Sequence, residues 1–164
     1  MMETERDMNP ENIEDLNKRP SNEHDAEFAR QAHHQAYHDV VVKQFGNWDE
    51  QVQDKFFQSA WSGSSHEIIS FNGQDCGYFS MEETDNSIEL HELVLLPKFQ
   101  GKGIGTKILN EVIEKAKAAK LPVHLQVLKE NKAADLYRRM GFKENGETDT
   151  HFQMELSSEM ETDV

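Results

Sequence analysis

The sequence predicts one domain of mixed α+β class, and three of its features support this prediction. Two apolar segments flank Asn72 and Gly73, a pair that is typical of a β-hairpin turn. A long apolar strand over residues 87–96 leads through a glycine-rich turn, residues 100–105, directly into a helix. A second strand and a second helix follow this helix. The 164 residues suffice for one domain with a hydrophobic core.

Two helices and four strands are expected before the glycine-rich turn. They are a strand near residues 13–19, helices over about 23–40 and 49–60, and strands over 67–71, 76–81 and 87–96. Ser21 or Asn22 can cap the first helix, because their side chains accept hydrogen bonds from the first helical amides. The second helix has one apolar face that includes Val52 and Phe56.

The part of the chain after the glycine-rich turn alternates between helices and strands. The expected elements are a helix over about 103–119, a strand over 123–128, a helix that begins after Asn131, and strands over 142–146 and 151–156. Gly141 is expected to end the last helix. The strand over 123–128 is nearly continuously apolar, which predicts burial on both of its faces.

The net charge of −14 is unevenly distributed along the chain. Residues 98–143 contain eleven of the 17 basic residues and four of the 31 acidic ones, a net charge of +7, whereas the rest carries −21. A polyanionic ligand is therefore favoured near the glycine-rich turn, and nucleic acid is disfavoured elsewhere. A solvated helix face explains the same basic residues equally well.

The composition indicates a soluble, cytoplasmic protein. No run of about 18 apolar residues is present to span a membrane, and the first residues lack the apolar segment of a signal peptide. The single cysteine, Cys76, is expected to be a small core residue, with a catalytic thiol as the alternative. Residues 1–11 and 157–164 are expected to be acidic tails of a domain over 12–156.

The glycine-rich turn is suited to bind phosphate. Glycines let backbone N–H groups converge on phosphate oxygens, and the dipole of the following helix adds partial positive charge. Neither a P-loop nor a Rossmann turn is indicated, because no Gly-Lys-Ser/Thr follows and the glycines are spaced Gly-x-Gly-x-Gly. The turn therefore predicts a ligand that carries a diphosphate.

A longer combination of residues is more specific. Gln100, Gly103 and Gly105 follow a strand that ends in Leu-Pro, and Tyr137 and the pair Gly141-Phe142 come about 30 residues or more later. This pattern resembles the GCN5-related N-acetyltransferases (the GNAT superfamily), in particular small single-domain members of bacterial type. The resemblance covers residues 13–156 and implies a twisted, mostly antiparallel sheet of seven strands with a splayed parallel pair and about four helices.

The resemblance implies acetyl-CoA as the cosubstrate and no metal. The pyrophosphate of acetyl-CoA would lie on the backbone amides of residues 100–106. The strand before the turn would bulge at Leu93–Leu95 and bond the pantetheine arm of acetyl-CoA. The residues implied to bind it are Leu93, Val94, Leu95, Gln100, Gly101, Lys102, Gly103, Ile104, Gly105, Thr106, Asn131, Ala133 and Tyr137. Asn131 departs from the family pattern by one position, because Glu130 stands where the family more often has asparagine. Capping the following helix is an equally good role for Asn131.

Direct transfer to an amine needs a proton acceptor and a proton donor. The resemblance implies that the Tyr137 hydroxyl protonates the leaving thiolate, whereas a structural role in the helix core is the alternative. Glu92, Glu89 or water without a fixed carboxylate can accept the proton of the amine. Strand alternation places Glu89 on one face and Glu92 with Val94 on the other.

The acceptor is expected to be the primary amine of a small molecule, and the net charge of −21 outside residues 98–143 favours a cationic one, such as a polyamine. Tyr37, Trp48, Asp49, Trp61 and His151 are candidates to line its pocket, with burial or surface placement as the alternative for each. His34 and His38 share a helix face, but the sequence offers no third metal ligand near them. Acetylation of protein N-termini or lysines, and a silent acyl-CoA-binding module, remain alternatives. A monomer or a homodimer is expected, without nucleic acid or membrane as partner.

Overall fold

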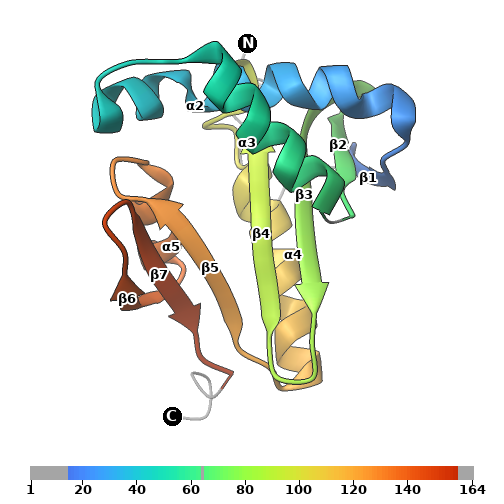
Figure 1. Cartoon of the computed structure of the whole chain (residues 1–164). Helices are drawn as coiled ribbons and strands as arrows, with labels where there is room; N and C mark the ends of the chain where they lie inside the picture. Colours follow the sequence, from blue (N-terminus) through green and yellow to red (C-terminus); the bar gives the residue numbers. More distant parts are fainter. Residues whose placement is uncertain (1–14, 64, 159–164) are drawn as a thin grey trace, which may run out of the picture. The chain divides into compact units, whose positions relative to one another are not determined.

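A computed structural model describes residues 15–63 and 65–158 (Figure 1). The strands are β1 (Leu16–Pro20), β2 (Glu67–Phe71), β3 (Gln74–Glu83), β4 (Ile88–Leu95), β5 (Val123–Leu128), β6 (Lys143–Glu147) and β7 (His151–Leu156). The helices are α2 (Ala26–Phe45), α3 (Glu50–Gly63), α4 (Ile104–Ala119) and α5 (Ala133–Arg139), with 3-10 turns η2 (Glu23–Asp25) and η3 (Pro97–Phe99). The strands form one sheet in the order β1-β2-β3-β4-β5-β7-β6, which confirms the predicted α+β class with seven strands.

The chain divides into two compact units, and β3, β4 and α4 each contribute to both. Unit 1 contains Met1–Ser80 and Glu92–Ile108, and unit 2 contains Met81–His91 and Leu109–Val164. Each unit is therefore described by itself.

In unit 1, the antiparallel strands β1, β2 and β3 are covered by α2 and α3. The hairpin between β2 and β3 turns at Asn72 and Gly73, whose positive φ angles of 54° and 80° suit the tight turn that the Asn-Gly pair predicts. The buried core cluster joins both helices to the strands, and its members are Ala29, Ala32, Phe57, Ile68, Tyr78 and Val94. Cys76 is buried as well, and burial raises the pKa of its thiol to about 12, which favours the core role.

The first long helix of unit 1 begins as predicted but ends five residues later than expected. The side chain of Asn22 accepts a hydrogen bond from the His24 amide, at 2.8 Å, and so caps η2, which continues into α2. At the other end, Gly46 adopts a φ of 91°, and its N–H bonds the carbonyl of Val42. A glycine in the left-handed conformation commonly ends a helix, so Gly46 explains why α2 ends at residue 45 and not at the expected residue 40.

In unit 2, β5 is the central strand. It pairs in parallel with β4 over Ile88–Leu90, and in antiparallel fashion with β7 over all six of its residues. The expected burial of β5 on both faces is wrong. Val123, Leu125 and Val127 are buried, whereas Gln126 between them is exposed, because only one face of β5 is covered.

The helices after the glycine-rich turn lie where the sequence places them. The side chain of Asn131 accepts a hydrogen bond from the Ala133 amide, at 2.9 Å, at the start of α5. Gly141, with a φ of 105°, ends that helix. Most of residues 1–11 and 157–164, the two expected tails, lie outside the described residues. Among the described helices, none combines the length and the apolar character that crossing a membrane requires.

Candidate functional site

The glycine-rich turn of unit 1 presents unused backbone amides. Gly101 and Gly103 have φ angles of 76° and 89°, a conformation that residues with a side chain rarely adopt. Helix α4 begins at Ile104, and the Lys107 amide bonds the Gly103 carbonyl at 3.0 Å. The amides of the first helical turn before Lys107 therefore have no carbonyl partner within the helix. Gln100 joins the turn to the end of β4, because its side-chain Nε2 donates to the Leu95 carbonyl at 2.9 Å.

The surroundings of this turn fit a diphosphate. A Cβ added to Gly101 would meet no atom within 4 Å, so the backbone is open on that side. Lys98, Lys102 and Lys107 lie in or next to the turn, and in the described part of the chain none of them forms an ion pair. The positive charge and the helix N-terminus act together on an anion here.

Strand β4 contains one residue more than the strand opposite it. The Thr84 amide bonds the Ser87 carbonyl, and the Leu96 amide bonds the Cys76 carbonyl. Leu96 lies nine positions after Ser87, whereas Cys76 lies only eight positions before Thr84. A β-bulge therefore lies in β4 between Ser87 and Leu96. The bulge that the resemblance implies at Leu93–Leu95 falls within this stretch.

The end of β4 also lies very close to β3 in unit 1. A Cβ on Gly77 would collide with the Val94 carbonyl and would lie 3.0 Å from the Leu95 Cα. Only glycine fits at position 77. The missing side chain lets β3 approach the backbone of Val94 and Leu95 this closely.

Glu92, the first residue of β4 that belongs to unit 1, is held by a buried histidine. Nε2 of His66 lies 2.8 Å from Oε1 of Glu92. The His66 side chain is 1% exposed and that of Glu92 is 18% exposed. Because a carboxylate only accepts hydrogen bonds, the contact places a proton on Nε2 of His66. Glu92 is therefore fixed at one oxygen and still reachable by solvent.

Aromatic rings surround this histidine. Trp61 stacks on His66 with the ring centres 4.4 Å apart, and Tyr78 contacts it edge-on at 5.5 Å. The Tyr78 hydroxyl is buried and has no hydrogen-bond partner among the described residues. Burial and the negative charge of Glu92 both raise the pKa of Tyr78, so its hydroxyl keeps its proton.

Glu89 lies in unit 2, in a more open environment. Oε2 of Glu89 accepts a hydrogen bond from the Ser87 hydroxyl at 2.6 Å and lies 2.8 Å from Nδ1 of His124. Burial raises the pKa of Glu89, but these two hydrogen bonds lower it more, so the pKa lies below its usual value. Glu89 and His124 line a polar groove of about 280 Å³, together with Leu90, His91, Leu125, Gln126, Asn145, Gln153 and Met154.

Tyr137 belongs to the core of unit 2. It is buried and packs edge-on against Phe142, with the ring centres 5.8 Å apart. Burial raises the pKa of Tyr137 to about 12, so its hydroxyl is protonated at neutral pH and able to donate. The packing shows the structural role of Tyr137, and its protonation is compatible with the chemical one. Ala133 starts the helix that carries Tyr137, and its amide donates to the Asn131 side chain just before the helix.

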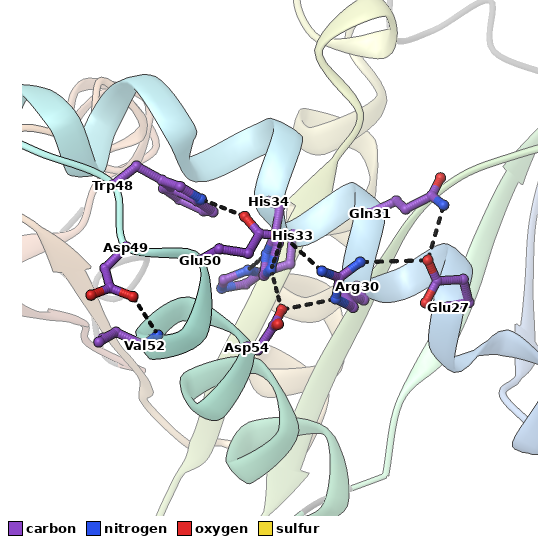
Figure 2. A network of polar contacts seen from close by, with 10 residues as sticks. All are labelled: Glu27, Arg30, Gln31, His33, His34, Trp48, Asp49, Glu50, Val52 and Asp54. Carbon is purple, nitrogen blue, oxygen red and sulfur yellow. Dashed lines mark hydrogen bonds and ion pairs between the residues drawn. The ribbon is translucent and has the colours of Figure 1, made fainter.

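A polar network joins α2 to α3 in unit 1 (Figure 2). Nε2 of His34 lies 2.7 Å from Oδ1 of Asp54, and Arg30 bonds both Asp54, at 2.8 Å, and Glu50, at 2.7 Å. Trp48 donates to Glu50 at 2.8 Å and packs against His34. The network stabilises the helix pair that covers the sheet in unit 1.

Three side chains of this network are close enough together to bind a metal ion, but Arg30 already neutralises the two carboxylates among them. His34, Glu50 and Asp54 offer ligand atoms within 4.8 Å of one another. The Arg30 guanidinium bonds both carboxylates, and the pKa of Asp54 is lowered by its hydrogen bonds to Arg30 and His34. A cation would have to displace Arg30, so this cluster is an ion-pair network of the helix pair.

Half of the chain matches one known family. The sequence model of the family described as the acetyltransferase (GNAT) domain matches residues 62–144 of this chain, just over half of its 164 residues. The chain belongs to the GNAT acetyltransferase family. The matched segment runs from the end of α3 through β2–β5 and α4 to α5, and it contains the glycine-rich turn and both glutamates.

Two archaeal relatives of this GNAT domain cover part of it. An uncharacterized N-acetyltransferase of Methanocaldococcus jannaschii is 38% identical over 94 residues, which are 56% of this chain and 40% of the relative. An uncharacterized N-acetyltransferase of Archaeoglobus fulgidus is 40% identical over 50 residues, 30% of this chain and 34% of the relative. The chain thus spans well under two thirds of the length of these relatives.

Solved structures share the GNAT fold at low sequence identity. The PaiA N-acetyltransferase of Thermoplasma acidophilum, solved in complex with coenzyme A, has a TM-score of 0.70 and 18% identity, over 87% of this chain and 98% of that one. The ribosomal-protein-S18-alanine N-acetyltransferase of Escherichia coli has a TM-score of 0.61 and 19% identity, over 86% and 92% of the two chains. At this identity the likeness establishes the fold alone.

The expected acceptor residues of the GNAT domain lie in different places. Trp61 stacks on His66 beside Glu92, and Tyr37 packs against the same core cluster. Trp48 belongs to the helix network, and the Asp49 carboxylate accepts the Val52 amide at the start of α3. In unit 2, His151 bonds the Thr150 hydroxyl at 2.7 Å, and burial lowers its pKa.

Sequence reasoning missed the two histidines that bond the glutamates. His66 and Glu92 are 26 residues apart, and His124 and Glu89 are 35 apart, so no local spacing connects them. The parallel pairing of Glu89 with His124 is the only signal that could have indicated the second pair. His66 precedes β2 by one residue and has no such direct register with Glu92.

Proposed function

We propose that this GNAT domain transfers the acetyl group of acetyl-CoA directly to the primary amine of a small molecule. One observation carries the proposal. Unit 1 contains both a glycine-rich turn with free backbone amides suited to phosphate and, eight positions before Gln100, a carboxylate that is fixed by a buried histidine. A site for a polyanionic cosubstrate and a carboxylate able to take a proton, on β4 and the turn that follows it, are what amine acetylation requires.

The residues around the turn fit acetyl-CoA. The amides of residues 101–106, with Lys102 and Lys107, would hold the pyrophosphate, and the bulged segment Leu93–Leu95 would bond the pantetheine arm. When bound, acetyl-CoA supplies the acetyl group as a thioester, which an amine can take without a covalent enzyme intermediate.

Glu92 is the better candidate for the base. An acceptor ammonium must lose a proton before its nitrogen can form the amide bond, and Glu92 takes this proton and passes it to solvent. The hydrogen bonds of Ser87 and His124 lower the pKa of Glu89, which makes that carboxylate a weaker proton acceptor. Glu92 is also the residue that shares a unit with the glycine-rich turn.

Tyr137 is the proposed proton donor. As the nitrogen–carbon bond forms and the carbon–sulfur bond breaks, the sulfur gains a negative charge. The Tyr137 hydroxyl, protonated because burial raises its pKa to about 12, gives its proton to that sulfur and recovers one from solvent. When the amide bond forms, the nitrogen loses a second proton to solvent, which balances the one that Tyr137 recovers. The reaction as a whole therefore releases one proton, equivalent to the one that Glu92 removes from the ammonium.

The charge distribution supports a cationic acceptor. Outside residues 98–143 the chain has a net charge of −21, which attracts cations. The Glu92 carboxylate, held by His66 and 18% exposed, adds a local negative charge that favours an ammonium group.

Thermal melting with and without acetyl-CoA, together with thiol release across a panel of amines and neutral amino acids, tests the proposal. We expect a higher melting temperature with acetyl-CoA, and fastest thiol release with cationic amines. Thiol release only with peptide acceptors would point to protein acetylation, and a melting shift without any release would point to a binding module. Faster turnover of neutral acceptors would contradict the charge argument.

A matched pair of glycine variants locates the phosphate. Gly103→Ala and Gly46→Ala both force an alanine into a left-handed conformation, with φ near 90°, at a cost of about 1–2 kcal/mol. Both variants should therefore melt at lower temperature without ligand. Only Gly103→Ala should lose the acetyl-CoA shift, and an equal shift in both would show that the pyrophosphate lies elsewhere.

A further inference from the structure

His66 is placed to control the geometry of Glu92. Its Nε2 donates to Oε1 of Glu92 at 2.8 Å, which leaves Oε2 as the oxygen able to accept a proton from an acceptor. The Glu92 side chain is 18% exposed, so its carboxylate is partly reachable, and the hydrogen bond from His66 is the contact that sets its orientation. A fixed orientation matters, because general bases act over hydrogen-bond distances.

The His66 ring itself cannot turn easily. Trp61 stacks on one face at 4.4 Å with an angle of 27° between the rings, and Tyr78 contacts the ring at 5.5 Å and 68°. The backbone is fixed too, because the His66 carbonyl accepts the Ser21 amide at 3.0 Å. The side chain is 1% exposed, so it does not reach the acceptor itself.

We propose that His66 is a positioning residue for acetyl transfer, which keeps Oε2 of Glu92 directed at the acceptor ammonium. This inference rests on the proposed function and on Glu92 as its base. The proton moves from the ammonium nitrogen to Oε2, while the Nε2 proton of His66 stays on the histidine and bonds Oε1. His66 thus acts through Glu92 and is not itself changed by the reaction.

A double-mutant cycle tests the proposal, with the amine that the wild-type protein acetylates fastest. His66→Phe keeps an aromatic ring between Trp61 and Tyr78 but removes the donor. We expect it to lower kcat by about 10- to 100-fold, because small displacements of a catalytic group have effects of this size. The KM for acetyl-CoA and its melting shift should stay unchanged. In the Glu92→Gln background, the same substitution should have no further effect on kcat.

Two polar variants keep the proposal testable if His66→Phe does not fold. The side-chain nitrogen of glutamine can reach the position of Nε2, whereas that of asparagine is too short to do so. His66→Gln should therefore retain kcat within about fivefold of wild type, and His66→Asn should lose as much as His66→Phe.

Each alternative result has a distinct meaning. Equal activity of all three His66 variants and the wild-type protein would overturn the positioning role and leave the proposed function intact. An equal loss from His66→Phe with and without Glu92→Gln would also overturn it, because His66 would then act independently of Glu92. Absence of transfer to any amine in the wild-type protein would overturn the proposed function and this inference together.

Discussion

Strand β4 carries two glutamates, and each of them bonds a histidine at the same distance of 2.8 Å. The two pairs differ in their surroundings. In unit 1 the side chains of His66 and Glu92 are 1% and 18% exposed, whereas in unit 2 those of His124 and Glu89 are 38% and 34% exposed. The same two residue types are therefore held in different environments, and only the His66 ring is shielded from water.

The two carboxylates also differ in what remains available to a substrate. One oxygen of Glu89 receives both the Ser87 hydroxyl and His124, and these bonds lower its pKa. Glu92 is held at one oxygen by a ring that is itself packed between aromatic residues. Water reaches the Glu89–His124 pair more easily and weakens it, whereas His66 is shielded from water and fixed by the rings around it.

The largest expected difference between the two pairs lies in catalysis. Glu92→Gln should lower kcat by about 10²–10⁴-fold, the contribution of a general base, with acetyl-CoA binding unchanged. Glu89→Gln should lower kcat by about threefold or less, because Glu89 is the weaker proton acceptor. Steady-state thiol release with both variants and the wild-type protein measures the two effects.

A larger loss of kcat in Glu89→Gln than in Glu92→Gln would contradict this assignment of the base. If Glu89→Gln removes activity and Glu92→Gln does not, the base is the exposed carboxylate in the groove of unit 2. If neither substitution lowers kcat, water acts as the proton acceptor without a fixed carboxylate. An unchanged acetyl-CoA melting shift in both variants is the control for correct folding.

The sequence predicted the glycine-rich turn and the Asn72-Gly73 hairpin because both depend on local backbone conformation. It also indicated both glutamates as candidates. It could not indicate His66, because the contact with Glu92 depends on a β-bulge and on two successive strand registers. The polar residues His124 and Gln126 alternate with Val123, Leu125 and Val127, and this alternation is the sequence signal that only one face of β5 is buried.

A second prediction extends the comparison to His33, another buried histidine of unit 1. Burial and the neighbouring His34 lower the pKa of His33 to about 4, from 6.5 in the unfolded chain. Between these pH values the unfolded chain binds the extra proton, so stability should fall as pH decreases from about 6.5 to about 4. The loss should reach about 2–3 kcal/mol, at about 1.4 kcal/mol per pKa unit.

Chemical denaturation of the wild-type protein and of His33→Phe at several pH values measures how much His33 contributes to the pH dependence of stability. His33 packs against the rings of Tyr37 and Phe57, at 4.9 and 5.7 Å, so phenylalanine keeps the packing and removes the titration. The difference in unfolding free energy between the two proteins should change across this pH range, whereas carboxylates common to both cancel. A constant difference would mean that His33 titrates normally.

A third prediction concerns the hydroxyl that lies near the buried pair. The Tyr78 hydroxyl is buried and has no hydrogen-bond partner among the described residues. Tyr78→Phe should therefore raise the free energy of unfolding by about 1 kcal/mol, because a buried polar group without a partner is destabilising. Denaturation with urea measures the change. A loss of stability would instead show that the hydroxyl is hydrogen-bonded in solution, for instance to a buried water.

The smallest expected effect concerns the exposed pair. His124→Gln should lower the free energy of unfolding by less than about 0.5 kcal/mol, because an ion pair open to water contributes little. Glu89 keeps its bond to the Ser87 hydroxyl in this variant, so no carboxylate is left without a donor. Urea denaturation at low salt and at about 1 M salt measures the loss, which should shrink further as the ions are screened. A salt-independent loss of several kcal/mol would mean that the Glu89–His124 pair behaves like the more buried Glu92–His66 pair. The difference in exposure would then no longer explain why the two glutamates of β4 differ.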